Sequence, residues 1–151
     1  MKRVFIAGSY SADSTIKCLK NIGNGERWTD YAFFEGMSPY NPFSDRERII
    51  RNPNRNYGVK QFQKATMKWL EVSEEVWVIP NSEKSKGVKA ELEKASELGI
   101  PIFDIIVEQL HDHCGGGEIT KLKLRDCKHE NLETFHENAP MVCSDCGEYM
   151  Q

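Results

Sequence analysis

The fold of this chain is decided by the stretch Val76-Trp77-Val78-Ile79-Pro80 and by the run Ser85-Lys86-Gly87-Val88-Lys89-Ala90-Glu91 that follows it. The first run is short, β-branched and aromatic and is ended by proline, which is typical of a buried strand. A polar turn separates it from the second run, which begins a helical pattern. Glu91 is therefore expected in the first turns of a helix, just beyond the carboxyl end of a central strand. Open α/β sheets bind small ligands at that edge.

Strand and helix patterns alternate on both sides of this stretch, which predicts a parallel sheet with right-handed crossovers. The expected strands cover residues 4–7, 36–42, 76–80, 101–107 and 119–124, and the expected helices cover 13–19, 26–35, 59–72 and 88–98. The strand at 36–42 is weak, because two prolines prevent a regular central ladder. The pattern at 119–124 leaves open whether this strand joins the sheet or the tail.

Two segments of this region carry more detailed expectations. Residues 43–57 are polar, rich in Arg and Asn and without sustained periodicity, which predicts a long loop, with a lid containing a short helical turn as one form of it. Its arginines are interpreted as solvated charges balanced by Asp45 and Glu47, with phosphate binding as the alternative. In the helix at 59–72, the expected buried residues are Phe62, Met67, Trp69 and Leu70.

Composition limits the possible functions. The chain has 151 residues and a net charge of −3. General nucleic-acid binding is not expected, because it requires a basic surplus. No apolar run approaches the roughly 20 residues that cross a bilayer, and the amino terminus is too weakly apolar for a secretory signal. A cytoplasmic protein without membrane association is therefore expected.

A change of composition divides the chain into two predicted parts. Three glycines, Gly115-Gly116-Gly117, separate an α/β domain at residues 1–114 from a linker and tail at 115–151. Four of the five cysteines lie in the last quarter of the chain. This distribution is unlike a disulfide framework and favours metal ligation in a reducing compartment.

The tail contains two pairs of metal-ligating residues. Cys127 and His129 form one pair, and Cys143 and Cys146 form the other. Two ligands from each of two turns suit a tetrahedral, structural Zn²⁺ site in a small zinc knuckle or ribbon. Zinc binding would then supply much of the folding free energy of this polar tail. His136 is an alternative to His129, and a disordered tail with incidental thiols is the alternative to metal binding.

Two further motifs carry a resemblance to a known family. They are the opening Val4-Phe5-Ile6-Ala7-Gly8-Ser9 and the apolar strand followed by Ser-x-Gly-x-x-x-Glu and a helix that ends in Gly-Ile-Pro-Ile. Residues 3–107 resemble the nucleoside 2-deoxyribosyltransferase-like superfamily, which includes the 2′-deoxynucleoside 5′-phosphate N-hydrolases. The resemblance implies a flavodoxin-like (Rossmann-like) parallel sheet of four or five strands with flanking helices. It also implies a homodimer with sites near the subunit interface.

The resemblance further implies cleavage of the bond between base and sugar in a nucleoside or nucleotide. Glu91 matches the family glutamate and would be the nucleophile at the anomeric carbon. Bond breaking builds positive charge on the sugar ring, and a nearby carboxylate stabilises or traps that charge. Glu91 is expected to stay ionised, because the dipole of a helix favours negative charge near its start. The alternative is that Glu91 is only a solvated helix residue.

Several small polar residues are expected to form the substrate pocket. Ser85 and the Gly87 amide would hold a 5′-phosphate or a sugar hydroxyl. Ser85 has an alternative role as the N-cap of the helix. The other side of the same pocket would be closed by Gly8, Ser9 and Ser11, and the candidates for stacking on a base are Tyr40 and Phe43.

Two positions depart from the family pattern. Thr66 stands where hydrolases of this group carry an aspartate, and a threonine cannot transfer a proton near neutral pH. Its hydroxyl can still bind a sugar oxygen. Phe5 stands where the nucleotide hydrolases have a tyrosine, so Tyr10 is the candidate substitute. These departures give two alternatives to an active enzyme: a nucleotide-binding sensor or sponge, and an interaction module that acts through its zinc tail.

Overall fold

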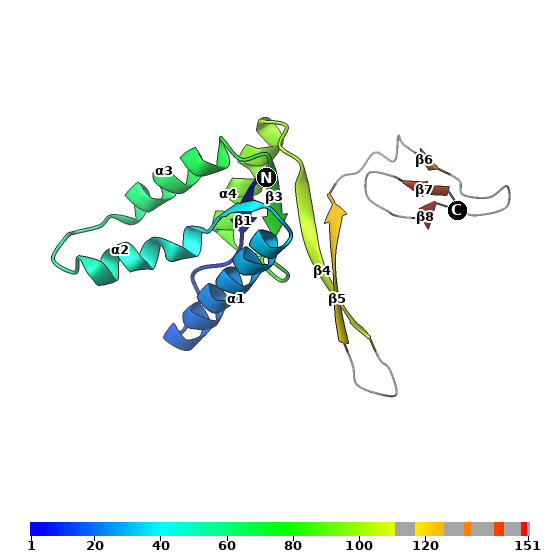
Figure 1. The fold of residues 1–151 in the computed structure, drawn as a ribbon. Coiled ribbons are helices and arrows are strands. Elements are labelled where there is room, and N and C mark those ends of the chain that lie inside the picture. Colours follow the sequence, from blue (N-terminus) through cyan, green and yellow to red (C-terminus); the bar gives the residue numbers. More distant parts are fainter. Residues whose placement is uncertain (111–116, 126–131, 134–140, 144–148, 151) are drawn as a thin grey trace.

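The computed structural model describes residues 1–110, 117–125, 132–133, 141–143 and 149–150. Its main part is a five-stranded sheet in the order β2-β1-β3-β4-β5 (Figure 1). The first four strands run parallel, and β5 runs antiparallel to β4. The strands are β1 (Arg3–Ala7), β2 (Ser38–Tyr40), β3 (Glu75–Val78), β4 (Ile102–Leu110) and β5 (Gly117–Leu124). The predicted α/β fold is confirmed, and the strand whose place was left open belongs to the main sheet.

A second sheet lies within the predicted tail. It is antiparallel, in the order β6-β7-β8. Its strands are β6 (Leu132–Glu133), β7 (Met141–Cys143) and β8 (Tyr149–Met150).

Helices connect the strands of the main sheet. They are α1 (Thr15–Phe34), the 3₁₀ helix η1 (Pro42–Ser44), α2 (Asp45–Arg51), α3 (Val59–Leu70) and α4 (Lys86–Glu97). Helices α3 and α4 lie where the sequence predicted helices. Within the described part of the chain, no helix combines the length and apolar character that a membrane span requires.

Helix α1 is longer than predicted. The two short helices expected between residues 13 and 35 form one continuous helix, so the predicted break was wrong. Ser14 caps its start, because the Ser14 Oγ accepts a hydrogen bond from the Lys17 backbone N–H at 3.3 Å. Glycine destabilises the interior of a helix, so Gly23 and Gly25 interrupt the helical pattern of the sequence. Gly25 instead packs on Phe43, whose ring leaves no space for a Cβ atom. Tertiary packing therefore carries the helix through this point.

The segment predicted as a loop at residues 43–57 contains most of η1 and all of α2, so the prediction underestimated its helical content. The Asn41 side chain accepts a hydrogen bond from the Phe43 backbone N–H at 2.9 Å, and Pro42 opens η1. Helix α2 follows directly with Asp45. An Asn cap followed by Pro is a helix-start signal. It lies just before the segment whose polar composition predicted a loop.

The predicted buried face of α3 is only partly right. Leu70 is fully buried, and Met67 and Phe62 are partly buried. Trp69 was expected in the core but is 52 % exposed. Its ring stacks on Tyr40 of the outer strand β2 at 5.2 Å between centroids. Trp69 is exposed because it covers the edge of the sheet, where one side of its ring faces solvent.

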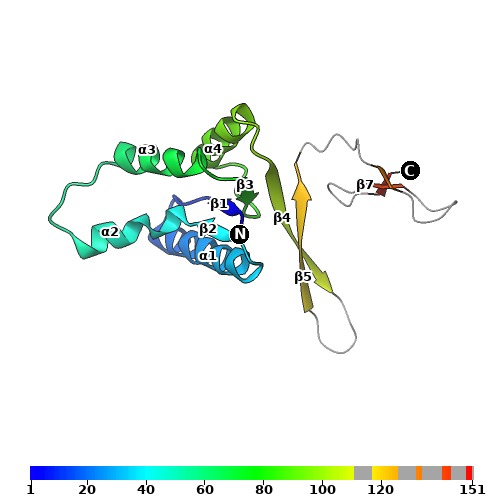
Figure 2. The ribbon, with the colours of Figure 1, turned by 45° about the horizontal axis from the view of Figure 1, so that its top comes forward.

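Two apolar cores cover opposite faces of the sheet. Side chains of a strand point alternately to the two faces. On β1, Val4 and Ile6 pack into the core that α1 covers, whereas Phe5 and Ala7 pack into the core under α3 and α4. Figure 2 shows α1 on one side of the strands and α3 and α4 on the other. Each face of the sheet therefore has its own apolar core.

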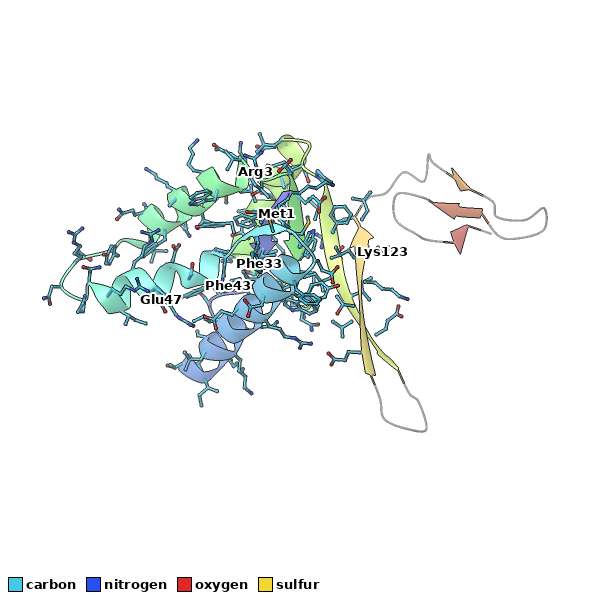
Figure 3. The ribbon with its side chains drawn as sticks, viewed as in Figure 1. Met1, Arg3, Phe33, Phe43, Glu47 and Lys123 are labelled. Carbon is cyan, nitrogen blue, oxygen red and sulfur yellow. The ribbon has the colours of Figure 1, made fainter. Side chains whose placement is uncertain are left out.

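Helices α2 and α3 form an arm at residues 45–70. In both views, α2, the connection at residues 52–58 and the start of α3 extend away from the sheet. Glu47 lies out on this arm, whereas Phe43 lies beside α1 (Figure 3). The base of the arm meets the sheet at β2, next to the candidate site.

Candidate active site

Glu91 points inward from α4. It lies three residues after Val88 and four before Ala95, and residues at these spacings share one face of a helix. Val88 is 1 % exposed and Ala95 is 0 % exposed, so this face packs on the sheet. The Glu91 Oε2 atom is buried and has no hydrogen-bond partner among the described residues. The alternative interpretation of Glu91 as a solvated helix residue is therefore wrong.

Burial changes the ionisation of Glu91. Loss of hydration raises the pKa of its carboxyl group from the ordinary 4.5 to about 8. The prediction that Glu91 stays ionised was therefore wrong for the ligand-free chain at neutral pH. The helix dipole acts mainly within the first turn, and Glu91 lies in the second turn of α4, where desolvation dominates. A buried carboxyl group of this kind is a functional-site candidate.

Tyr40 lies near both Thr66 and Glu91. Tyr40 ends β2 and stacks on Phe5 at 5.7 Å between ring centroids. Burial raises the pKa of Tyr40, and the negative charges of Asp45 and Glu91 act in the same direction. A side-chain hydrogen bond with Thr66 lowers the pKa of Tyr40. Thr66 is 8 % exposed, so its hydroxyl is directed inward to this bond. Tyr40 therefore places an aromatic hydroxyl beside Thr66, next to the Phe5 ring.

Asp45 is a second carboxyl group beside Tyr40, and sequence reasoning missed it. Its side chain is 18 % exposed, and one of its oxygens lies 3.6 Å from the Arg48 Nε. Burial raises the pKa of Asp45, while Arg48 lowers it. The sequence analysis treated Asp45 as a counter-charge in a loop. The Asn-Pro helix start just before it was the available signal that this residue is held in place.

The residues at the start of α4 have a structural role. The Ser85 Oγ accepts a hydrogen bond from the Val88 backbone N–H at 3.5 Å and caps the helix. This is the alternative role that the sequence analysis gave to Ser85. Gly87 is exposed. Ligand binding by Ser85 and Gly87 stays a prediction.

The loop after β1 is fixed by close packing. A Cβ atom on Gly8 would lie 2.6 Å from Ile79 Cδ1 and 2.8 Å from Phe43 Cζ, so only glycine fits. Tyr10 stacks on Phe43 at 6.0 Å between centroids. Burial raises the pKa of Tyr10, with a further contribution from the charge of Asp45. Tyr10 and Tyr40 thus both lie near Asp45.

Ser9 lies at a cavity that Glu91 does not line. The Ser9 backbone N–H donates to the Ser82 Oγ at 3.1 Å. Ser9 lines a cavity of about 240 Å³ whose other lining residues do not include Glu91, Ser85 or Gly87. Ser11 is exposed. The structure therefore places Glu91, Thr66 and Asp45 each near Tyr40 and places Ser9 at a separate cavity.

The predicted zinc ligands are not described. Cys127, His129 and Cys146 lie outside the described residues, and of Cys143 only its place at the end of β7 is described. Among the residues that are described, no group of three or more His, Cys, Asp or Glu side chains is arranged to hold a metal ion. The zinc site stays a prediction.

The chain was compared with curated proteins and with protein-family models. No curated protein matches the chain. A family model described as a domain of unknown function, DUF7768, matches residues 2–105. The matched segment contains Tyr40, Asp45, Thr66 and Glu91 and excludes the tail. Since the match covers more than half of the chain, this protein belongs to the DUF7768 family.

Proposed function

We propose that this chain cleaves the N-glycosidic bond of a nucleoside or nucleotide, with Glu91 as the nucleophile at the anomeric carbon. The observation that carries the proposal is the buried Glu91 carboxyl group, whose Oε2 atom lacks a hydrogen-bond partner among the described residues. A buried carboxylate without a partner is unfavourable. Positive charge that develops on a sugar ring would supply the missing partner in the transition state.

The two carboxyl groups divide the chemistry. The base–sugar bond breaks, and its electron pair leaves with the base. Glu91, which is protonated in the ligand-free chain, gives up its proton as the substrate binds, and its carboxylate forms an ester bond to the anomeric carbon. Asp45 receives that proton and donates it to the leaving base. Water then attacks the same carbon, its proton returns to Asp45, and Glu91 is released.

Tyr40 and Thr66 serve to position the sugar in this proposal. Tyr40 is held by stacking between Phe5 and Trp69. Its hydroxyl, bonded to Thr66, can also accept or donate a hydrogen bond to a sugar oxygen. Because the Glu91 Oε2 is buried, a sugar reaches it only after a neighbouring side chain moves. We place that movement at the base of the arm, which carries Asp45.

The test is release of free base from a panel of nucleosides and 5′-nucleotides, with ribose and with 2′-deoxyribose. We expect Glu91→Gln to lose at least about 10³-fold in turnover, because an amide cannot form the sugar ester. Glu93→Gln is the matched control, because Glu93 is an exposed glutamate of the same helix. The proposal fails if no substrate yields base, or if Glu91→Gln is as active as the parent chain.

One observation favours a second candidate function. Thr66 stands where hydrolases of the nucleoside 2-deoxyribosyltransferase-like superfamily carry an aspartate. Its hydroxyl is hydrogen-bonded to Tyr40. A chain that kept the pocket and lost turnover would act as a nucleotide-binding sensor or sponge. In that case nucleotides would raise the thermal midpoint without release of base. Absence of any shift at millimolar nucleotide would reject this function.

A further inference from the structure

The cavity at Ser9 is a distinct recess on the other face of the sheet. It holds about 240 Å³ and is formed by the loop after β1, the loop after β3 and the middle of α1. Its lining residues are Ser9, Asn21, Asn24, Ile79, Pro80, Asn81 and Ser82. Ile79 belongs to the core that α1 covers, whereas Val88, beside Glu91, belongs to the opposite core. The cavity is therefore separate from the Glu91 carboxyl group, although both follow the carboxyl ends of the central strands.

The two loops that form the cavity are held in place. Ser82 is 2 % exposed, and its Oγ accepts the hydrogen bond from the Ser9 N–H that joins the loops. The Asn21 Nδ2 donates to the Tyr10 carbonyl oxygen at 3.4 Å. Asn81 has a φ of 64°, a left-handed conformation that Asn adopts more readily than most residues. The two loops and the Asn21 side chain are thus held in place, whereas Asn24 is exposed.

The lining is polar and carries no charged side chain. Three asparagines and two serines offer donors and acceptors, and Ile79 and Pro80 supply apolar surface. A phosphate or carboxylate would lose hydration here without meeting a cation, which disfavours anionic ligands. The asparagine amide matches the paired donor and acceptor on the edge of a heterocyclic base, as in bidentate recognition of adenine. The volume lies below the roughly 300–1,000 Å³ of drug-sized sites and suits a single ring system.

We propose that this cavity binds an uncharged heterocyclic base, with Asn24 and Asn21 of α1 recognising its polar edge. The inference goes beyond the proposed function, because this cavity is separate from Glu91. The base that Glu91 would release is bonded directly to the carbon that Glu91 attacks, so a base bound in this cavity is a second ligand.

The test is binding of free adenine, hypoxanthine, cytosine and uracil to the full chain, measured by calorimetry and by ligand-observed NMR. We expect at least one base to bind and Asn24→Leu to weaken its binding by about tenfold or more. Asn24 is the sharper variant, because Asn21 also holds the Tyr10 carbonyl. Lys20→Leu is the matched control, since Lys20 is an exposed residue of the same helix outside the lining. Asn24→Ser is a second variant that should also weaken binding. An unchanged circular dichroism spectrum would show that this variant is folded.

The outcomes separate this inference from the proposed function. Binding of a base by a chain that releases none, lost in Asn24→Leu, keeps the cavity assignment and rejects the enzyme. Release of base by the chain, together with binding of free base that Asn24→Leu does not weaken, keeps the enzyme and rejects the cavity assignment. The assignment also fails if no base binds at millimolar concentration, or if ribose 5-phosphate displaces the bound base. Glu91→Gln should leave the affinity for free base unchanged.

Discussion

Glu91 is a residue whose charge the ligand-free fold disfavours. Buried polar groups in folded proteins nearly always have a partner, and exceptions require an explanation. The other buried carboxyl group of the sheet, Glu75, is paired with Lys2 at 2.6 Å and with the Trp77 Nε1 at 3.0 Å. Glu91 has no such support at its Oε2 among the described residues. This contrast supports the proposal that a ligand is the partner of Glu91.

This residue makes stability depend on pH. The folded-state pKa of Glu91 is raised from 4.5 to about 8, so the folded chain holds a proton that the unfolded chain loses. Stability is then greatest below about pH 4.5 with respect to this group and falls as the pH rises to about 8. The full loss is on the order of 5 kcal/mol. The Glu91→Gln variant should resist urea as well as the parent near about pH 5 and better than the parent near about pH 9. Glu93→Gln should leave the urea midpoint unchanged at both pH values. Equal pH dependence of stability in Glu91→Gln and in the parent would contradict the predicted effect of Glu91.

Asp45 is predicted to act on the leaving base. Asp45→Asn removes the proton donor, so turnover should fall by about 10²- to 10⁴-fold for ordinary bases. The fall should be much smaller for a substrate whose leaving group needs no proton, because bond breaking then proceeds without the acid. Release rates for both substrate types provide the measurement, and Glu47→Gln on the same helix is the control. An equal fall for both substrate types would show that Asp45 only supports the fold.

The sequence predicted one carboxyl group of this pair and missed the other, for a physical reason. Glu91 follows a strand at a fixed spacing, and its helix face is set by Val88 and Ala95. Asp45 is brought to Tyr40 by the path of η1 and α2, which only tertiary packing defines. The ionisation of Glu91 was also misjudged, because the helix dipole is a local property whereas burial depends on the whole sheet.

At the scale of elements, α1 shows how packing overrides propensity. Gly23 and Gly25 both lower the intrinsic stability of the helix. Nothing lies within 4 Å of a Cβ atom built on Gly23, whereas a Cβ on Gly25 would overlap the Phe43 ring. The break predicted near these residues is absent because Phe43, from η1, fills the space over Gly25. The periodicity of apolar residues in the sequence does not predict the contact between Gly25 and Phe43.

The two glycines form a matched pair for a stability test. Gly23→Ala should stabilise the chain by about 1 kcal/mol, because alanine favours the helix and meets no neighbour. Gly25→Ala should destabilise it by about 1–3 kcal/mol, because the new methyl group displaces Phe43. Urea unfolding measures both changes. Adding Phe43→Leu to Gly25→Ala should recover part of the loss, and a stabilising Gly25→Ala would contradict the packing described for α1.

At the scale of the whole molecule, the order of elements was the most predictable feature. Alternation of apolar strands and helices gave the parallel sheet, and short β-branched runs gave β1, β3 and β4. The place of β5 was not predictable, because an alternating strand fits either an antiparallel sheet edge or the tail. We expect the chain to form a homodimer, as the family resemblance implies. Light scattering after size-exclusion chromatography measures this, and a monomer at micromolar concentration would reject it.

The tail provides the last prediction. Cys143 ends β7 and β8 begins at Tyr149, so the Cys143-x-x-Cys146-Gly147 motif lies between two antiparallel strands. Zinc ribbons take two of their metal ligands from a Cys-x-x-Cys pair of this kind. We predict one Zn²⁺ per chain, held by Cys127, His129, Cys143 and Cys146.

Metal analysis of the purified chain tests this prediction, with Cys18→Ser as the control because Cys18 lies on α1, outside the tail. Cys143→Ser should lose the zinc, and Cys18→Ser should retain it. Because the tail is short and polar, its folding depends on the metal. Chelation should therefore make residues 126–151 sensitive to protease while the main sheet resists cleavage. A chain without zinc, or a Cys143→Ser variant that keeps it, would leave the three-stranded sheet to be explained without a metal.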